Sequence, residues 1–325
     1  MIRRREFIAG LGGAAAWPLA ARAQQPVRLR RIGMMLGAGD DANQFTAFAS
    51  ALAQAGWVEG RTVTIERRFG AGDDARIRAD VAELIARSPD LIVCLGSRNT
   101  AIVKEQTRTI PVVFVSVADP VASGFVASYA RPGGNITGFT STEFSFVTKW
   151  VSLLKDIAPG LRNVMLLYDP TNPAAEPSLR TLEAGAPTLR VTVSPAPAAD
   201  FGEIERHIES FARQPNAGMI VAPGAATIPN AEKIAALAVR HRLPAMGSSR
   251  YFTSGGGLAS YGPLLNDNVR RAAQYVDRIL RGEKPADLPV QAPTRFEFVL
   301  NLKAAKAIGL DVSPQVQLLA DEVIE

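Results

Sequence analysis

Residues 88–120, SPDLIVCLGSRNTAIVKEQTRTIPVVFVSVADP, decide the fold, because their pattern returns at residues 214–252 as QPNAGMIVAPGAATIPNAEKIAALAVRHRLPAMGSSRYF. Each copy runs from a turn into an apolar strand, a loop of small residues, a helix and a short strand that a proline opens. Open α/β sheets bind their ligands in the loops at the carboxyl ends of the strands. The repeat therefore predicts two similar lobes whose strand ends face each other across a cleft.

Strand and helix patterns also alternate along the rest of the chain. Helical spacing of apolar residues, including a short helix at 121–130, separates segments that have the period of strands. We expect strands at residues 31–36, 62–69, 91–95, 135–140, 163–168, 188–194, 219–222, 258–261 and 295–300. Such alternation is typical of parallel sheets that are covered by helices on both faces. The predicted fold class is α/β, with two doubly wound, Rossmann-like lobes of parallel sheet joined by a hinge.

The series of strands begins again after residue 142, and this divides the chain. We expect the first lobe to comprise residues 29–142 and about 266–282, and the second lobe residues 143–263 and about 290–325. The segment 282–293 contains Ala and Pro and should be extended, as a crossing between lobes would be.

Composition and charge exclude several classes of protein. The chain of 325 residues is long enough for two domains and has a net charge of +5. Without the first 23 residues, 32 Lys and Arg face 30 Asp and Glu, and no basic stripe interleaved with aromatics is present, so nucleic acid is not an expected partner. Cys94, the only cysteine, lies in an apolar strand, which predicts a buried core residue and no disulfide within the chain.

Residues 1–23 have the three parts of an export signal. A twin arginine, Arg4-Arg5, precedes an apolar run at 9–21, and Ala21-Arg22-Ala23 matches an A-x-A cleavage site. The alternative interpretation is an amphipathic terminal helix, which does not explain all three parts. We therefore expect a twin-arginine (Tat) signal peptide and a mature protein in the periplasm that begins at Gln24.

Polar residues gather where the predicted strands end. The loop 96–100 offers backbone N–H groups and hydroxyls at a helix N-terminus, a suitable place for a carboxylate, although Ser97 or Asn99 would also serve as ordinary caps. Asp119 would serve the donor end of a ligand, and Tyr251 would either stack on it or cover the core. The candidate ligand-binding residues are Gly37, Asp40, Ser97, Asn99, Thr100, Asp119, Asp169, Asn172, Thr227, Ser248, Ser249 and Tyr251.

One motif favours a different class of protein. Residues 37–42, GAGDDA, follow a strand and match the G-x-G-x-x-A pattern of dinucleotide-binding folds. Asp40 and Asp41 would place two carboxylates against a pyrophosphate, which opposes that interpretation. An exported oxidoreductase with a nucleotide cofactor is the alternative hypothesis. The sequence lacks the common catalytic and metal-binding motifs, so we expect no catalytic residue, no metal and no cofactor.

Several short motifs, taken in their order, resemble one known family, that of ABC-transporter substrate-binding proteins, which includes tryptophan- and tyrosine-binding members. The motifs are Gly96-Ser97, Ser116-Val117-Ala118-Asp119-Pro120-Val121, Gly134-Asn135-Ile136-Thr137-Gly138, Leu258-Ala259-Ser260-Tyr261-Gly262 and Asn301-Leu302-Lys303-Ala304-Ala305-Lys306. The resemblance covers essentially the whole mature chain. It implies a type I periplasmic-binding-protein fold, with two α/β lobes joined by three crossings that close on a small ligand.

The resemblance also implies a function. We expect a non-catalytic, monomeric periplasmic protein that binds a small molecule, carboxylate-bearing or aromatic, in the cleft and passes it to an ABC permease through transient contact. A ligand-sensing module that docks on a membrane receptor is a further alternative.

Overall fold

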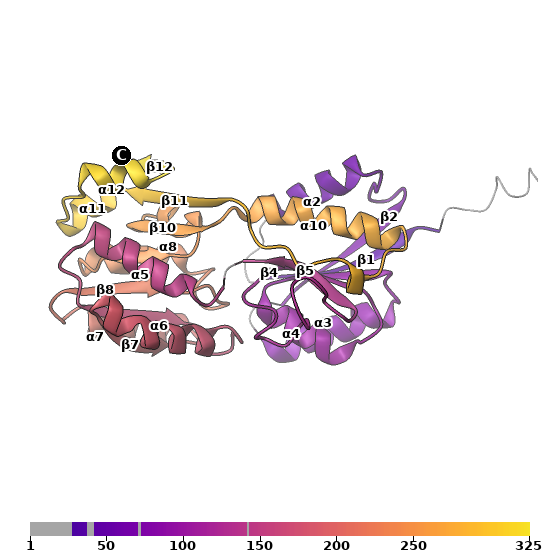
Figure 1. The fold of residues 1–325 in the computed structure, drawn as a ribbon, viewed down its shortest axis with the longest axis horizontal. Coiled ribbons are helices and arrows are strands. Elements are labelled where there is room, and N and C mark those ends of the chain that lie inside the picture. Colours follow the sequence, from indigo (N-terminus) through magenta and orange to yellow (C-terminus); the bar gives the residue numbers. More distant parts are fainter. Residues whose placement is uncertain (1–27, 38–41, 71–72, 142) are drawn as a thin grey trace, which may run out of the picture.

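The computed structural model describes residues 28–37, 42–70, 73–141 and 143–325, which form two lobes that lie side by side (Figure 1). The predicted signal peptide and Asp40 lie outside the described residues. Each lobe is built on its own sheet, and the chain passes between the lobes three times. The predicted α/β class with two lobes is therefore confirmed.

The first lobe contains a parallel sheet of five strands in the order β2-β1-β3-β4-β5. Its strands are β1 (Arg30–Leu36), β2 (Val63–Phe69), β3 (Leu91–Leu95), β4 (Val112–Val117) and β5 (Ile136–Thr140). Helices α2 (Ala42–Gln54) and α10 (Leu265–Leu280) cover one face, and α3 (Asp74–Ala86) and α4 (Ser97–Gln106) cover the other. Helix α10 follows most of the second lobe in the sequence. Its apolar side chains, Val276 among them, nevertheless pack in the core of the first lobe.

The strand β3 lies at the centre of this sheet and is apolar along its whole length. All five of its residues are buried, as a strand covered on both faces requires. Cys94 is fully buried there, and burial raises the pKa of its thiol above the ordinary range. The predicted place of Cys94 in the core is confirmed.

The second lobe contains a sheet of seven strands in the order β12-β11-β10-β9-β8-β6-β7. Its strands are β6 (Asn163–Tyr168), β7 (Thr192–Pro197), β8 (Ala217–Val221), β9 (Ala245–Gly247), β10 (Ala259–Pro263), β11 (Phe296–Asn301) and β12 (Glu322–Ile324). All neighbours pair in parallel except β10 and β11, which are antiparallel. The predicted parallel arrangement does not extend to this one pair, because β11 enters from the first lobe.

Helices cover both faces of the second sheet as well. Their apolar side chains belong to two separate cores, one on each face. One core takes residues from α5 (Phe146–Ile157), α6 (Ala175–Leu189), α11 (Leu302–Ile308) and α12 (Pro314–Leu319). The other takes residues from α7 (Phe201–Phe211), α8 (Ala231–Arg240) and α9 (Arg250–Ser254).

The repeat that was found in the sequence corresponds to a repeated sheet. Counted from the start of each lobe, the first five strands follow the order 2-1-3-4-5 in both sheets. The order reverses between the first and third strands, and at such a reversal the flanking loops diverge and leave a crevice. The crevice of the first lobe lies beyond β1 and β3, and that of the second lobe beyond β6 and β8.

Two stretches differ from the sequence prediction. Residues 121–130 form no helix: Ser123 N–H donates to Asp119 O in a turn that ends at Gly124, whose φ of +68° departs from the helical conformation. Helix α6 continues to Leu189, with Pro187 in its last turn, so the strand expected at 188–194 begins at Thr192. Strand β7 lies at the sheet edge, where Pro195 and Pro197 need no N–H for pairing.

Candidate ligand-binding site

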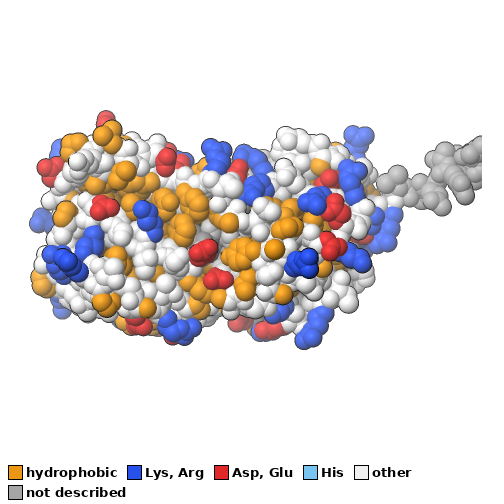
Figure 2. Space-filling model, viewed as in Figure 1, with side chains coloured by type: hydrophobic (Ala, Val, Ile, Leu, Met, Phe, Trp, Pro, Cys, Tyr) orange, Lys and Arg blue, Asp and Glu red, His pale blue; other side chains and the backbone are white. Residues whose placement is uncertain are grey.

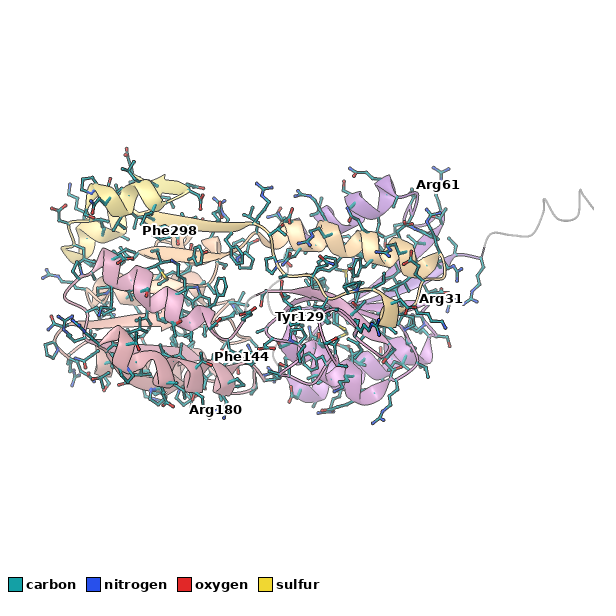
Figure 3. The ribbon with its side chains drawn as sticks, in the orientation of Figure 1. Arg31, Arg61, Tyr129, Phe144, Arg180 and Phe298 are labelled. Carbon is teal, nitrogen blue, oxygen red and sulfur yellow. The ribbon has the colours of Figure 1, made fainter. Side chains whose placement is uncertain are left out.

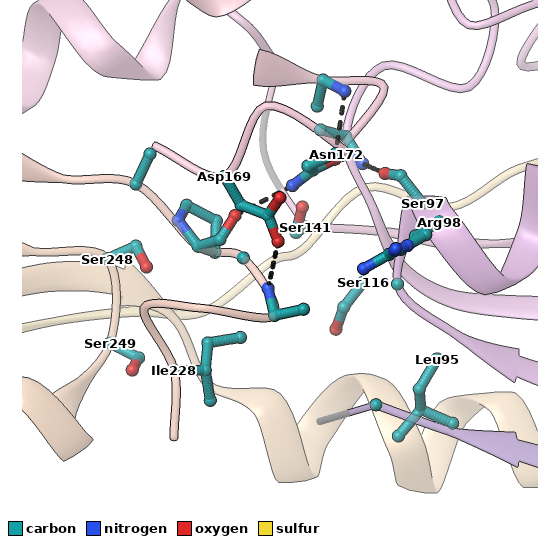
Figure 4. Close-up of a pocket in the computed structure, with 18 of the residues that line it drawn as sticks. Leu95, Ser97, Arg98, Ser116, Ser141, Asp169, Asn172, Ile228, Ser248 and Ser249 are labelled. Atoms are coloured by element: carbon teal, nitrogen blue, oxygen red, sulfur yellow. Dashed lines mark hydrogen bonds between the residues drawn. The ribbon is translucent and has the colours of Figure 1, made fainter. Parts of the chain in front are cut away.

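A cavity of about 520 Å³ lies between the lobes and is lined by loops from both of them. Its volume is in the range of small-molecule sites. The loops that follow β1, β3 and β4 contribute one wall, and those that follow β6, β8 and β9 contribute the other (Figure 4). Strand ends from both crevices therefore meet at one cavity.

On the first-lobe wall, Asn99 holds two loops together. Its buried Nδ2 group donates to Leu36 O at 2.9 Å and to Leu95 O at 3.0 Å. Because these carbonyls end β1 and β3, the amide fixes the two strand ends that flank the crevice. Gly96 begins the turn into α4 with a φ of +86°, a conformation that strongly favours glycine.

Two serines extend this wall toward β4. Ser97 Oγ accepts a hydrogen bond from Ala118 N–H at 3.2 Å, and its own hydroxyl hydrogen can still be donated to a ligand. Ser116 lines the cavity at an irregularity of the β4–β5 pairing, with a φ of +59°. Bulges of this kind re-aim side chains and are common beside binding sites.

On the second-lobe wall, Asp169 and Asn172 join the loops after β6 and β8. The buried Asp169 carboxylate accepts from Thr171 N–H at 2.9 Å, from Thr171 Oγ1 at 2.6 Å and from Ala225 N–H at 2.8 Å. Asn172 Nδ2 donates to Pro223 O at 2.8 Å. Three neutral donors thus compensate the burial of the carboxylate, and the loops approach closely.

Four aromatic side chains contribute to the apolar surface of the cavity. Phe144, Trp150, Tyr168 and Tyr251 all line it. The Trp150 indole N–H donates to Tyr261 O at 2.7 Å, which leaves its ring as an apolar surface. Burial, with smaller contributions from Glu176 and Glu183, raises the pKa of Tyr168, so this phenol stays neutral at physiological pH.

Arg98 supplies positive charge at the cavity. Its side chain is only 16% exposed, and its Nε lies 2.6 Å from Asp74 Oδ1. In Figure 4 the guanidinium lies beside Ser97 and Ser116, at the first turn of α4. Among the described residues, the other charged side chains of the cavity wall are Glu143 and Asp169. A guanidinium beside free backbone N–H groups is suited to bind a carboxylate.

The structure brings eight of the twelve candidate residues to the cavity. These are Gly37, Ser97, Asn99, Asp169, Asn172, Ser248, Ser249 and Tyr251. Asp40 lies outside the described residues. Whether the eight bind a ligand stays a prediction.

The remaining three candidates do not line this cavity, and each has a local partner. Thr100 Oγ1 donates to Gly96 O at 2.8 Å, and Thr227 Oγ1 donates to Ala222 O at 2.7 Å. Asp119 Oδ1 accepts from Ala122 N–H at 3.1 Å and so stabilises its own turn. Their polar groups therefore hold the loops in shape.

Sequence reasoning missed many side chains of the wall, among them five that the proposed site uses or that carry a ring: Arg98, Ser116, Phe144, Trp150 and Tyr168. Arg98 lies in the loop 96–100 and Ser116 in the motif 116–121, but their spacing does not distinguish them from their neighbours. The rings of Phe144, Trp150 and Tyr168 follow the same patterns as core residues. These five residues line the cavity.

Two further properties concern membranes and metals. None of the described helices is long and apolar enough to cross a membrane. Within the same part of the chain, no three His, Cys, Asp or Glu side chains are grouped so that they could hold a metal ion.

Comparison with known proteins found one matching family model and a similar protein. The model of a family described as ABC transporter substrate binding protein matches residues 40–324. The tyrosine-binding protein of Clostridioides difficile (strain R20291) is 22% identical over 269 residues, which are 81% of this chain and 75% of that protein.

Solved structures show the same fold. The ABC domain from Streptococcus pneumonia, in complex with L-Trp, has a TM-score of 0.83 at 21% identity and covers 91% of this chain and 100% of its own. A conserved domain protein of Vibrio cholerae has a TM-score of 0.85 at 22% identity, with the same coverage. The ligand-free, open structure of a substrate binding protein with adhesive properties from Clostridium difficile has a TM-score of 0.67 at 20% identity and covers 91% and 99%.

Proposed function

This chain belongs to the ABC transporter substrate binding protein family, and we propose that it binds a small organic carboxylate with a ring-sized apolar body between its lobes. The observation that carries the proposal is the make-up of the cavity, in which Arg98 lies on the first-lobe wall and several aromatic rings face the same space. Such a cavity can bind a charged group and an apolar body at once.

The anionic end of the ligand would bind at the first turn of α4. The N–H groups of this turn have no partner within the helix, and the helix dipole favours negative charge there. Arg98 adds a charge-assisted hydrogen bond, and the hydroxyls of Ser97 and Ser116 lie beside it. Asp74 holds Nε of Arg98 and so orients the guanidinium before any ligand arrives.

The apolar end would lie against the rings of the second lobe. Trp150 lies on α5 and Tyr168 ends β6, so rigid elements hold both rings. Rings of this kind contribute both buried area and stacking geometry. Relatives support this choice of ligand: one solved structure of the fold holds L-Trp, and one relative is named a tyrosine-binding protein.

Membership of the family supports a proposal about the partner of this chain and its location in the cell. Substrate-binding proteins bind small molecules, work with ABC permeases and are typically periplasmic or extracytoplasmic. We propose that this chain is exported through the twin arginine Arg4-Arg5, acts in the periplasm as a monomer without catalysis, and meets its permease transiently. Contacts that the ligand makes with both lobes would favour the closed state, because only differential affinity shifts such an equilibrium.

Calorimetric titration with two probes tests the proposal. L-tryptophan and indole-3-propionate share a ring and a carboxylate, and the second lacks the ammonium group. We expect Arg98→Gln to weaken binding of either probe by roughly ten- to a hundredfold, because it removes a hydrogen bond between charged groups. Asp74→Asn removes the ion pair but keeps the guanidinium, so it should weaken binding less than Arg98→Gln does.

The two probes also separate the parts of the proposal. Binding of indole-3-propionate alone would identify a carboxylate without an ammonium group as the substrate class. Equal affinity of Arg98→Gln and the native chain would place the carboxylate elsewhere. If neither probe binds the native chain, the proposed class of ring-bearing carboxylates is wrong.

A further inference from the structure

We propose that the cavity selects carboxylates that carry no ammonium group. The reason is the direction of its hydrogen bonds, because acceptors of the wall already receive hydrogen bonds from the chain itself, while donors remain for a ligand. The inference rests on the proposed function and narrows it. Among ring-bearing carboxylates, the substrate would be one with a hydrogen atom, a hydroxyl or a keto oxygen at the position where an amino acid carries its ammonium group.

On the first-lobe wall, backbone carbonyl groups accept hydrogen bonds from side chains of the same lobe. Four residues that line the cavity have such carbonyl groups: Leu36, Leu95, Gly96 and Ala118. Asn99 Nδ2 donates to the first two, at 2.9 Å and 3.0 Å. Thr100 Oγ1 and Ser123 Oγ donate to the other two, at 2.8 Å and 3.2 Å. Each of these carbonyl groups therefore has a donor before any ligand binds.

The loop after β8 shows the same feature on the second-lobe wall. Residues 222–224 line the cavity, and the carbonyl group of each one accepts a hydrogen bond. The donors are Thr227 Oγ1 to Ala222 O at 2.7 Å, Asn172 Nδ2 to Pro223 O at 2.8 Å and Ile228 N–H to Gly224 O at 3.0 Å. Three consecutive acceptors of this wall are thus occupied as well.

The carboxylate of Asp169 is occupied in the same way. Its Oδ1 accepts from both N–H and Oγ1 of Thr171, and its Oδ2 accepts from Ala225 N–H. A carboxylate has about four acceptor positions, so three of them are filled, whereas an ammonium group has three hydrogen atoms to donate. Asp169 is also only 2% exposed. The chain therefore uses this carboxylate to hold its own loops.

Glu143 is the other carboxylate of the cavity wall among the described residues. It is exposed, and Ser145 Oγ donates to its Oε2 at 3.4 Å. Figure 3 marks the next residue, Phe144, at the junction of the two lobes. Ion pairs in water contribute little free energy. Glu143 therefore gives little compensation to an ammonium group that loses its water in the cavity.

Donors, in contrast, remain at the first turn of α4. No side chain caps this turn, and the first N–H groups of a helix have no partner within it. The ion pair with Asp74 uses Nε of Arg98, and a guanidinium has two further nitrogen atoms with hydrogen to donate. Ser97 Oγ accepts from Ala118 N–H and keeps its own hydrogen. This part of the wall suits an anion.

The apolar surroundings turn this difference into selectivity. Figure 2 shows that hydrophobic side chains gather in the middle of this face, across the junction of the lobes. An ammonium group that moves from water into such surroundings loses much free energy unless acceptors pair with it. A hydroxyl or keto oxygen at the same position can instead accept from the hydroxyls of Ser248 and Ser249, which line the cavity. An unpaired charge on the rejected molecule is a common source of specificity.

Calorimetric titration with a matched pair of probes tests the inference. L-tryptophan and L-indole-3-lactate have the same ring, carboxylate and configuration, and differ in an ammonium group against a hydroxyl. We expect the native chain to bind L-indole-3-lactate roughly tenfold or more tightly than L-tryptophan, because the ammonium group stays without sufficient acceptors. Indole-3-propionate, which has hydrogen at that position, should also bind more tightly than L-tryptophan.

Three variants show whether the occupied acceptors set this preference. Thr171→Val removes the Oγ1 donor and frees an acceptor position on Asp169, so it should reduce the preference for the lactate severalfold. Thr181→Val is the matched control, because Thr181 Oγ1 donates to Pro177 O within α6, and it should keep the native ratio of affinities. Glu143→Gln should change the affinities for both probes by the same factor.

Three results would overturn the inference. The first is equal or tighter binding of L-tryptophan by the native chain. The second is a loss of affinity in Glu143→Gln that affects L-tryptophan alone. The third is a native ratio of affinities in folded Thr171→Val, as in Thr181→Val. Binding of no indole carboxylate would contradict the proposed function and this inference with it. Equal binding of both probes would leave the function standing, so the two failures are distinguishable.

Discussion

Asp90 connects the beginning of β1 to the turn before β3. Its Oδ2 accepts from Arg31 N–H at 2.8 Å, and its Oδ1 accepts from Arg30 Nη1 at 2.8 Å. Burial alone would raise the pKa of Asp90, but the Arg31 N–H and the Arg30 guanidinium outweigh it and hold that pKa below its usual value. The charged form of Asp90 is therefore more stable in the folded chain than in the unfolded one.

This shift predicts how stability depends on pH. A carboxyl whose pKa is lowered by folding stabilises the fold above its unfolded pKa of about 3.9, and the contribution is lost as pH falls through the folded value. We expect Asp90→Asn to lower the free energy of unfolding at pH 7, while the difference from the native chain shrinks in strong acid. Urea unfolding of the native chain and the variant at pH 7 and in strong acid checks this. An equal difference in the free energy of unfolding under the two conditions would contradict the prediction.

Single residues of the site differ in how well sequence can identify them. Ser97, Asn99 and Asp169 were predicted because each follows a strand of a recognisable α/β unit, where a rule of topology applies. Trp150 was not, because its spacing on α5 is that of a core residue and it is only 4% exposed. Whether such a ring borders only its own core or also a cleft depends on where the other lobe lies, and a local sequence pattern does not show this.

Among the elements of the cavity wall, the loops after β6 and β8 pack closely against each other. A Cβ atom added to Gly224 would lie 2.4 Å from the Cβ of Asp169, well inside van der Waals contact. Glycine at this position therefore allows Ala225 N–H to reach the Asp169 carboxylate.

This close contact predicts that a methyl group added at Gly224 lowers the stability of the fold. Gly224→Ala should destabilise the fold by about 1–3 kcal/mol, the usual cost of overpacking, and should weaken ligand binding because the wall moves. Gly134→Ala is the matched control, since a Cβ there meets nothing within 4 Å. Chemical denaturation gives the free energy of unfolding of both variants. Equal values would show that the two loops move apart without cost and would contradict the prediction.

The elements themselves were largely predictable from sequence. β3 and β8 are runs of buried apolar residues bounded by turn residues, and the repeat of strand, loop and helix around them gave the architecture. The prediction failed where two signals competed, as at Pro187, which lies inside α6 although proline usually ends a helix. It also missed β12, whose three residues find a partner only when β11 crosses from the other lobe.

At the scale of the whole molecule, the lobe division stays a proposal. We propose residues 29–142 with about 266–282 as one unit and residues 143–263 with about 290–325 as the other. The two sheets and their separate cores support it, since β1 to β5 and α10 contribute to one set of cores and β6 to β11 contribute to another.

Export of the molecule is predicted to depend on the twin arginine. The double change Arg4→Lys, Arg5→Lys keeps the charge but removes the pair that the Tat receptor reads. We expect unprocessed precursor to remain in the cytoplasm, as immunoblots of cell fractions would show. Mature protein in the periplasm of cells with this variant would contradict the Tat prediction.

The central claim is that one small molecule binds in the cavity between the lobes. Native mass spectrometry, with the chain titrated by indole-3-propionate and L-tryptophan, tests it most directly. The account predicts one bound probe per native chain and loss of the bound form in the double variant Arg98→Gln, Trp150→Ala, which alters one side chain on each wall. Undiminished one-to-one binding in a folded double variant, or no binding of either probe to the native chain, would contradict it.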